Sequence, residues 1–170
     1  MKIAQKYSHL NGEEYLIVHH GKLYKEIITT VESIDAQEYL TKESKEKTML
    51  GKKLYSPIEL NKIFNEKFNS LGWHGSKYRY YVTTEPKLLP ELISLSYEKQ
   101  KVFLIEHGVE NPISSYKQTD FVKERIAIEV QFGKYAFVAF DLFVKHLLFY
   151  SGNEINLGIE ILLTKRMHLK

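Results

Sequence analysis

Residues 125–132, RIAIEVQF, decide the fold, because two kinds of side chain alternate along them. A period of two is typical of a β-strand, whose successive residues point to opposite faces. One face would carry only apolar residues, namely Ile126, Ile128, Val130 and Phe132. The other would carry Arg125, Ala127, Glu129 and Gln131. The strand, which Gly133 is expected to end, would thus present a carboxylate and an amide next to each other.

Asp120 stands nine residues before Glu129, just ahead of the short apolar pair Phe121 and Val122. A tight hairpin over that distance would return Asp120 to the side of Glu129. Two carboxylates held close together are disfavoured unless a cation neutralises them, and Mg²⁺ prefers such oxygen ligands. The pair therefore predicts a divalent metal site, where the ion could activate water and stabilise charge on a phosphodiester. An alternative stays open, since an acid at a hairpin and a Glu-x-Gln on an edge strand also occur as ordinary solvated residues.

The clearest helix signal begins at Ser56, a good N-capping residue followed by Pro57 and, where a capping box closes, by Glu59. Gly72 stands where this helix would stop. One apolar face would run along the helix, made of Leu60, Ile63, Phe64, Phe68 and Leu71. Trp73, which follows, is expected to anchor a core or an interface.

Two further helices have weaker signals. Residues 13–33 place apolar side chains at partly helical spacing, with Gly21 where the helix could break. Residues 96–107 predict a helix that Gly108 ends. Between these helices, residues 41–53 carry many charges and few apolar side chains, which predicts a mobile charged loop.

Strands are predicted at residues 78–84, which are rich in aromatic and β-branched side chains, and at residues 155–163. Residues 137–150 are too long and too apolar for a simple loop. Asp141 and Lys145 lie there at i,i+4 spacing, so we predict a mostly buried helix that covers the sheet.

The composition fits one α/β domain, since the chain has 170 residues and 44% of them are apolar, enough to bury a core. Its 24 basic and 21 acidic side chains give a net charge of +3, which neither requires nor excludes a polyanionic partner. Without cysteine, disulfides and thiolate chemistry are excluded, and the seven histidines lack the spacing of a zinc site. No apolar run has the length of a signal peptide core or membrane span, so we expect a cytoplasmic protein.

The segments QTDFVK (residues 118–123) and AIEVQFGKY (residues 127–135) resemble the active-site hairpin of type II restriction endonucleases, in the BstYI-like and, more distantly, the BglII-like branch. The likeness extends over nearly the whole chain, to about Leu162. It includes YSHLNG (7–12), SIDA (33–36), TKESKEKT (41–48), LYSP (54–57), YYVT (80–83) and DLFVKH (141–146). So many evenly placed matches are far more specific than any one motif.

This resemblance implies the PD-(D/E)xK nuclease fold, an α/β fold with a mixed central sheet flanked by helices. It implies that Asp120 and Glu129 hold Mg²⁺, with the peptide carbonyl of Val130 completing the metal shell. Gln131 stands where the family usually has Lys, and a neutral amide can orient the attacking water but cannot act as a base. The implied reaction is hydrolysis of duplex DNA at a short palindromic, GATC-centred site, RGATCY-like in form, with Asp120, Glu129 and Gln131 as catalytic residues.

The resemblance also implies partners. A two-fold symmetric site is matched most simply by a homodimer, and a cognate DNA methyltransferase is expected in the same host. Lys134 suits the O6 and N7 atoms of guanine, while Lys123 and Arg125 flank the hairpin and could contact phosphates. Each of these three could equally be an ordinary surface charge, and the charged segment 41–53 could fold against DNA.

A rival hypothesis follows from the end of the chain. After Leu162 the sequence departs from the resembling enzymes, which continue with further sheet and tail segments, into TKRMHLK (residues 164–170). We therefore expect a single endonuclease domain over residues 1–170 that lacks the family's C-terminal segment. On the rival hypothesis the chain is a catalytically silent remnant that folds partly, or binds DNA without cutting it.

Overall fold

The computed structural model describes residues 1–132 and 135–164, which form two compact units. The N-terminal unit contains Met1–Trp73 and the described parts of Val130–Tyr135 and Ile161–Lys170. The sheet unit contains His74–Glu129 and Ala136–Glu160. That the chain is one endonuclease domain stays a prediction. Within the described part of the chain, no helix is both long and apolar enough to cross a membrane.

Helices α1 (Gly12–His19) and α2 (Gly21–Glu32) open the N-terminal unit. They confirm the helix predicted over residues 13–33, together with its break at Gly21. The spacing of apolar residues in α2 gives it one buried side, made of Leu23, Ile27 and Val31.

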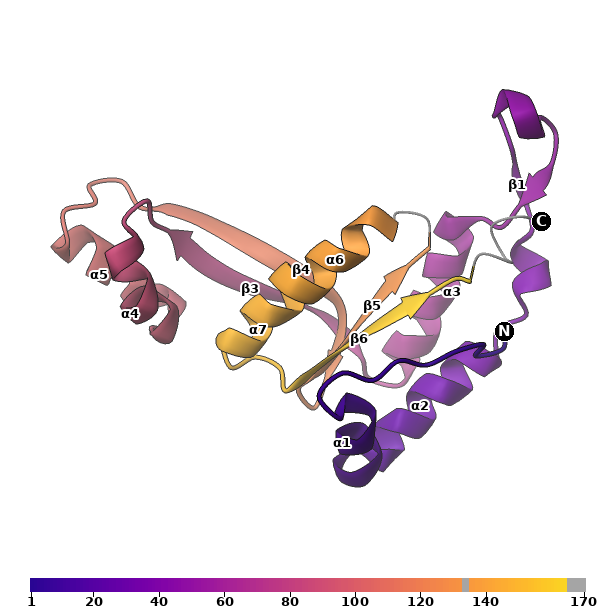
Figure 1. Ribbon diagram of the computed structural model, residues 1–170, viewed down its shortest axis with the longest axis horizontal. Helices are drawn as coiled ribbons and strands as arrows, with labels where there is room; N and C mark the ends of the chain where they lie inside the picture. The colour runs from indigo at the N-terminus through magenta and orange to yellow at the C-terminus, as the bar shows by residue number, and fades with distance from the viewer. Residues whose placement is uncertain (133–134, 165–170) are drawn as a thin grey trace. The chain divides into compact units, whose positions relative to one another are not determined.

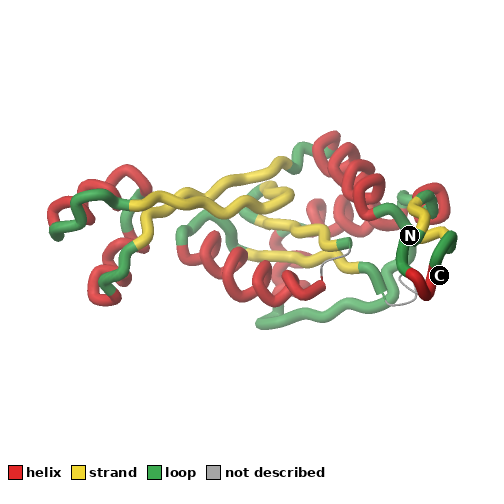
Figure 2. The backbone as a smooth tube through the Cα atoms, turned by 90° about the horizontal axis from the view of Figure 1, so that it is seen from above, coloured by secondary structure: helices red, strands yellow, loops and turns green. Residues whose placement is uncertain are grey.

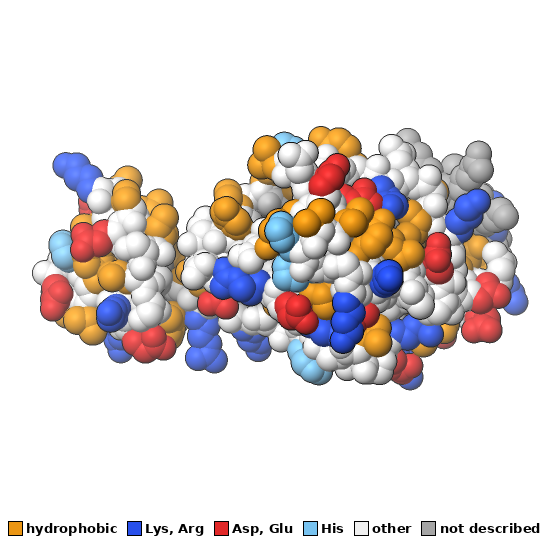
Figure 3. All heavy atoms as spheres, turned by 90° about the horizontal axis from the view of Figure 1, so that it is seen from below, with side chains coloured by type: hydrophobic (Ala, Val, Ile, Leu, Met, Phe, Trp, Pro, Cys, Tyr) orange, Lys and Arg blue, Asp and Glu red, His pale blue; other side chains and the backbone are white. Residues whose placement is uncertain are grey.

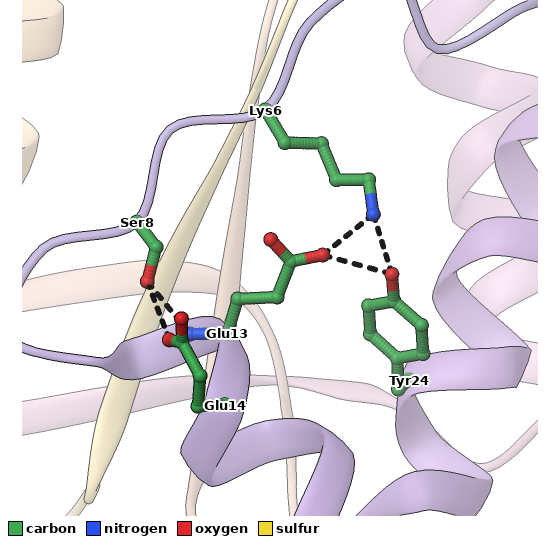
Figure 4. A network of polar contacts seen from close by, with 5 residues as sticks. All are labelled: Lys6, Ser8, Glu13, Glu14 and Tyr24. Atoms are coloured by element: carbon green, nitrogen blue, oxygen red, sulfur yellow. Dashed lines mark hydrogen bonds and ion pairs between the residues drawn. The ribbon is translucent and has the colours of Figure 1, made fainter.

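A polar network ties the N-terminal segment to these two helices (Figure 4). Lys6 Nζ donates to Glu13 Oε1 and to the Tyr24 hydroxyl, each at 2.5 Å, and Tyr24 donates to the same Glu13 oxygen at 2.8 Å. The Ser8 hydroxyl accepts from the backbone N–H of Glu13 and donates to Glu14. The hydrogen bonds from Lys6 and Tyr24 lower the pKa of Glu13. Because exposed ion pairs add little stability, the network mainly fixes how the chain enters α1.

Helix α3 (Pro57–Ser70) begins and ends where the sequence predicts. The Ser56 hydroxyl accepts from the backbone N–H of Glu59 at 3.4 Å, which satisfies one of the free donors of the first turn. Gly72 adopts a positive φ of 82°, a conformation that suits glycine after a helix end. The buried face of α3 is apolar and consists of Leu60, Phe64 and Phe68.

Trp73 belongs to the core of the N-terminal unit, as predicted. Its ring packs edge-on against Phe68, with ring centroids 5.8 Å apart. Its indole N–H donates to Glu26 Oε2 at 2.9 Å, so this buried donor is satisfied. Phe132 extends the same aromatic cluster, since its ring lies 5.1 Å from that of Phe64.

The charged segment between α2 and α3 contains regular structure, so the loop prediction is wrong in part. After the short 3-10 helix η1 (Ala36–Tyr39), strands β1 (Lys42–Glu43) and β2 (Lys53–Leu54) pair antiparallel around η2 (Lys47–Met49). Backbone hydrogen bonds hold this ribbon without the apolar alternation that a sequence pattern detects.

Strands β3 (His74–Val82), β4 (Ile113–Lys123), β5 (Ile126–Gln131) and β6 (Leu157–Leu162) form one sheet in that order. β3 pairs antiparallel with β4, and β4 with β5. In Figure 1, β5 and β6 run in the same direction, joined by a helical crossover. The sheet is therefore mixed and flanked by helices, as predicted. β3 begins four residues before the predicted strand, because its polar start at His74 is paired through the backbone.

β3 and β4 extend as a long two-stranded ribbon with helices at its far end (Figure 2). These are η3 (Pro86–Leu88), α4 (Leu89–Ser94) and α5 (Tyr97–Glu106), of which α5 confirms the helix predicted at 96–107. Their small core consists of Leu92, Phe103 and Leu104 with Tyr81 of β3 packed against it.

Residues 138–151 form a continuous helical segment, here the crossover helix. It consists of α6 (Val138–Phe140), a π-helical stretch η5 (Asp141–His146) and α7 (Leu147–Ser151), preceded by η4 (Tyr135–Phe137). It lies across the sheet (Figure 1) and packs on it through Phe149, beside Ala127 and Ile155. The predicted helix is confirmed, but its predicted burial is wrong: the buried residues include Asp141 and His146, while most apolar side chains are exposed.

Candidate active site

The turn between β4 and β5 sets the geometry of the candidate site. Glu124 and Arg125 both have positive φ, 47° and 66°, as in the two-residue turns that match the twist of a hairpin. The register pairs Phe121 with Ile128. Continued by one pair, it brings Asp120 opposite Glu129, the arrangement predicted from their spacing.

Glu129 is buried in the sheet unit, with 4% of its surface exposed, whereas Asp120 is exposed. Burial and the negative charge of Asp120 raise the pKa of Glu129 to about 7, against the opposing influence of Thr119 and Lys145. The sequence pattern placed Glu129 on a polar, solvent-reached face, and this is wrong, because the crossover helix covers it. A carboxylate poised in this way is typical of functional sites.

Lys145 of the crossover helix is the partner of Glu129 that the sequence did not reveal. Its Nζ lies 2.9 Å from Glu129 Oε2 and 2.8 Å from Asp141 Oδ1, with all three side chains largely buried. Burial opposes the charged ammonium, but the hydrogen bonds to Asp141 and Glu129 outweigh it and raise the pKa of Lys145. The only available signal was a polar i,i+4 pair inside an apolar stretch, which also describes an ordinary helix surface.

The backbone of Asp120 is held closely by β3. The β3–β4 register shifts between His74 and Ser76, an irregularity of the kind that often lies beside active sites. A Cβ at Gly75 would lie 3.3 Å from the Asp120 carbonyl oxygen, so the missing side chain permits this close approach.

Asp120 and Glu129 are the residues that could hold a metal ion. Among the described residues, Glu129 Oε1 and Thr119 Oγ1 are buried and make no hydrogen bond of good geometry, although Thr119 lies close enough to Glu129 to lower its pKa. An unpaired buried carboxylate oxygen is unfavourable, and a hard cation would satisfy it. The described part of the chain has no cluster of three His, Cys, Asp or Glu side chains able to hold a metal. The pair of carboxylates fits a cation such as Mg²⁺, which usually keeps several waters and binds one or two carboxylates.

The remaining predicted site residues are divided between the two units or fall outside the described part of the chain. Val130, which is buried, and Gln131, which is partly exposed, belong to the N-terminal unit, and their roles stay predictions. Lys134 lies outside the described residues. Lys123 ends β4 at the hairpin, paired with Ile126.

Arg125 has a structural role at the base of the crossover. Its guanidinium donates to the Asn153 carbonyl (2.6 Å), to Asn153 Oδ1 (2.7 Å) and to Asn156 Oδ1 (3.0 Å), while its own carbonyl accepts from the N–H of Asn156 (2.7 Å). These bonds tie the hairpin tip to the loop before β6. A phosphate contact by Arg125 stays a prediction.

A second buried polar pair joins the crossover helix to β6. His146 Nε2 lies 3.0 Å from Glu160 Oε1, with both side chains largely buried. Gly158 lets the strand approach, since a Cβ there would lie 2.4 Å from the His146 ring. Outside such pairs, basic and acidic side chains are interspersed on the face drawn in Figure 3.

Comparisons with known proteins bear on the family and the fold. The family model of restriction endonuclease BglII/BglIII matches residues 4–170. Among solved structures, the chain is similar to restriction endonuclease BglII complexed with a DNA 16-mer, with a TM-score of 0.53 and 19% identity, covering 92% of this chain and 56% of that one. The chain thus spans little more than half the length of that protein, and the likeness shows a shared fold. A comparison with curated proteins finds no match.

Proposed function

Because the chain belongs to the restriction endonuclease BglII/BglIII family, we propose that it cleaves duplex DNA at a specific site, with Asp120 and Glu129 as its essential acids. The observation that carries this proposal is the buried Glu129 carboxylate, which has one unpaired oxygen and lies beside the charge of Asp120. An arrangement so unfavourable by itself is accounted for by a cation that binds there.

Asp120, Glu129 and the Val130 carbonyl would hold Mg²⁺. When bound, the ion lowers the pKa of water and stabilises negative charge on the phosphodiester. Gln131 orients the attacking water by hydrogen bonds, and as a neutral amide it takes no proton. The water oxygen forms the new bond to phosphorus as the bond to the leaving oxygen breaks, and the water proton passes to bulk water or a phosphate oxygen.

The substrate proposed is a palindromic GATC-centred site, RGATCY-like in form. The similar BglII structure is a complex with DNA, which supports a duplex substrate. Lys134 would read guanine, while Lys123 and Arg125 would contact phosphates. The host DNA would be protected by a cognate methyltransferase, and both enzymes would work in the cytoplasm, where that DNA lies.

A homodimer is proposed because each strand of a two-fold symmetric site then meets one subunit. The exposed apolar stripe of the crossover helix supports it, since Phe143, Leu147 and Tyr150 recur at helical spacing and are each more than half exposed. Exposed apolar patches of this kind are typical of protein–protein interfaces.

The direct test is to incubate a plasmid of known sequence with the protein and Mg²⁺ and to sequence the ends. We expect cleavage at one short site, abolished by Asp120→Asn and by Glu129→Ala because each removes a metal ligand. Gln131→Ala should slow cleavage less, since it removes orientation and no charge. Glu66→Gln, in an exposed pair with Lys62, is the matched control and should cleave normally.

Two results would contradict the proposal in different ways. A single-turnover rate for Asp120→Asn or Glu129→Ala within about tenfold of the parent rate would remove the metal-site assignment. Binding of duplex DNA by the parent without any cleavage would instead support the catalytically silent form.

A further inference from the structure

Lys145 brings a positive charge into the acidic site from a different element of the sheet unit. Its ammonium lies between Glu129 and Asp141, and the three side chains are 14%, 5% and 5% exposed. Buried charges are tolerated when they are paired with good geometry, as these are. The contact with Glu129 exists only because the crossover helix lies on the sheet, so it is a product of folding rather than of local sequence.

Because of the ion pair, the two carboxylate oxygens of Glu129 have different surroundings. Oε2 is bound to Lys145 at 2.9 Å, whereas Oε1 is buried with no hydrogen-bond partner among the described residues. A carboxylate fixed through one oxygen has a defined rotamer and presents the other oxygen in one direction. Partners of this kind orient metal ligands in many proteins.

We propose that Lys145 is a positioning residue, which orients Glu129 toward the divalent cation and neutralises the acidic site while no cation is bound. This inference rests on the proposed function, because it takes Glu129 as a metal ligand. Gln131 is neutral and supplies no positive charge to the site. The ammonium of Lys145 supplies that charge beside Glu129.

The charges of the cluster support a site for one divalent ion. Asp120, Glu129 and Asp141 bring three negative charges when ionised, and Lys145 offsets one of them. The two remaining negative charges match one Mg²⁺. Without Lys145, the ammonium that both Glu129 and Asp141 contact would be lost, and the metal-free protein would carry more repulsion between acids at this place.

The test is the thermal stability of the full chain as a function of Mg²⁺ concentration, in the parent and in Lys145→Met. The variant keeps the length of the side chain and loses the charge. We expect its Tm without Mg²⁺ to fall. Its half-maximal Mg²⁺ concentration should drop about tenfold, because removing a like charge beside the ion outweighs the lost orientation of Glu129, which should show instead in the cleavage rate. Lys62→Met removes an exposed lysine and should leave the Mg²⁺ concentration unchanged.

A double-mutant cycle with Glu129→Gln separates charge compensation from packing. Lys145→Met should lower the Tm less in the Glu129→Gln background, where the ammonium no longer has to compensate an ionised Glu129, although Asp141 still contacts it. If Lys145→Met alone fails to fold, folding of the double variant shows the same coupling. An equal loss of Tm in both backgrounds, or an unchanged Mg²⁺ midpoint, would mean that Lys145 only packs, and would overturn the proposal.

The cleavage rate tests the positioning role of Lys145 independently of stability. At saturating Mg²⁺, the single-turnover rate of Lys145→Met should fall about 10- to 100-fold, while DNA affinity measured by anisotropy stays the same. If the parent does not cleave but the Mg²⁺ midpoint shifts as expected, the proposed reaction fails and the role of Lys145 stands. If Mg²⁺ changes the Tm of neither protein, both fail.

Discussion

Helix α3 and the crossover helix have opposite distributions of side chains. In α3 the buried face is entirely apolar, and Phe64 has no exposed surface. The crossover helix buries Asp141, Lys145 and His146, while 74% of the surface of Phe143 is exposed.

The difference indicates what each helix contributes to the protein. A helix that buries apolar side chains gains stability from them, so α3 stabilises its unit. A helix that buries charged groups and exposes aromatic ones gives up part of that gain. In the crossover helix, the polar side contacts Glu129 of the candidate site, and the apolar side is the surface proposed to meet a second copy.

The largest change in the free energy of unfolding is expected in α3, whose apolar side is buried. Phe64→Ala should lower the free energy of unfolding by about 3–5 kcal/mol, because it opens a cavity beside Phe68 and Phe132. Urea denaturation followed by circular dichroism measures the change. Phe143→Ala is the matched control and should cost less than about 0.5 kcal/mol in the monomer. Equal losses of unfolding free energy in the two variants would contradict the contrast between the two helices.

A smaller effect is expected where the crossover helix buries its polar side against β6. A Cβ at position 158 would overlap the His146 ring, so Gly158→Ala should cost about 1–3 kcal/mol. Gly21→Ala, whose Cβ would meet nothing within 4 Å, should leave stability unchanged or slightly raised by about 0.5 kcal/mol. Urea midpoints of the two variants measure these changes, and a neutral Gly158→Ala would contradict close packing of the crossover helix on β6.

The smallest effect on folding is expected on the apolar side of the crossover helix. Phe143→Ser with Leu147→Ser should change the free energy of unfolding of the monomer by no more than about 0.5 kcal/mol. It should nevertheless shift the protein from dimer to monomer in sedimentation equilibrium, because it removes the exposed stripe. Ile58→Ser, an equally exposed apolar position on α3, is the control. A dimer that survives the double substitution must use another surface.

Local signals account for the parts of the fold that the sequence predicted well. Ser56, Pro57 and Gly72 define α3 through backbone preferences that need no distant partner. Asp120 and Glu129 meet through a two-residue turn between adjacent strands, so their spacing alone was sufficient. Helix α4 is absent from the helices predicted, although its Pro90 lies in the first turn, where proline is favoured.

The parts that were missed depend on contacts distant along the chain. Lys145 reaches Glu129 only after the chain has crossed the sheet, and no periodicity within either element encodes that meeting. The orientation of the crossover helix was mispredicted for the same reason. Its apolar residues indicated a helix correctly, but the side that faces the sheet carries contacts to residues distant along the chain, those of Lys145 with Glu129 and of His146 with Glu160.

The two-residue turn at Glu124 and Arg125 limits how this protein can vary by insertion and deletion. Because strand side chains alternate, one residue gained or lost there would slip the register and turn Ile128 or Val130 toward the place of Glu129. The hydrogen bonds from Arg125 to Asn153 and Asn156 also restrict the length of the turn, because they tie it to the loop before β6. Homologues that keep the chemistry should therefore differ at this turn in residue type before they differ in length.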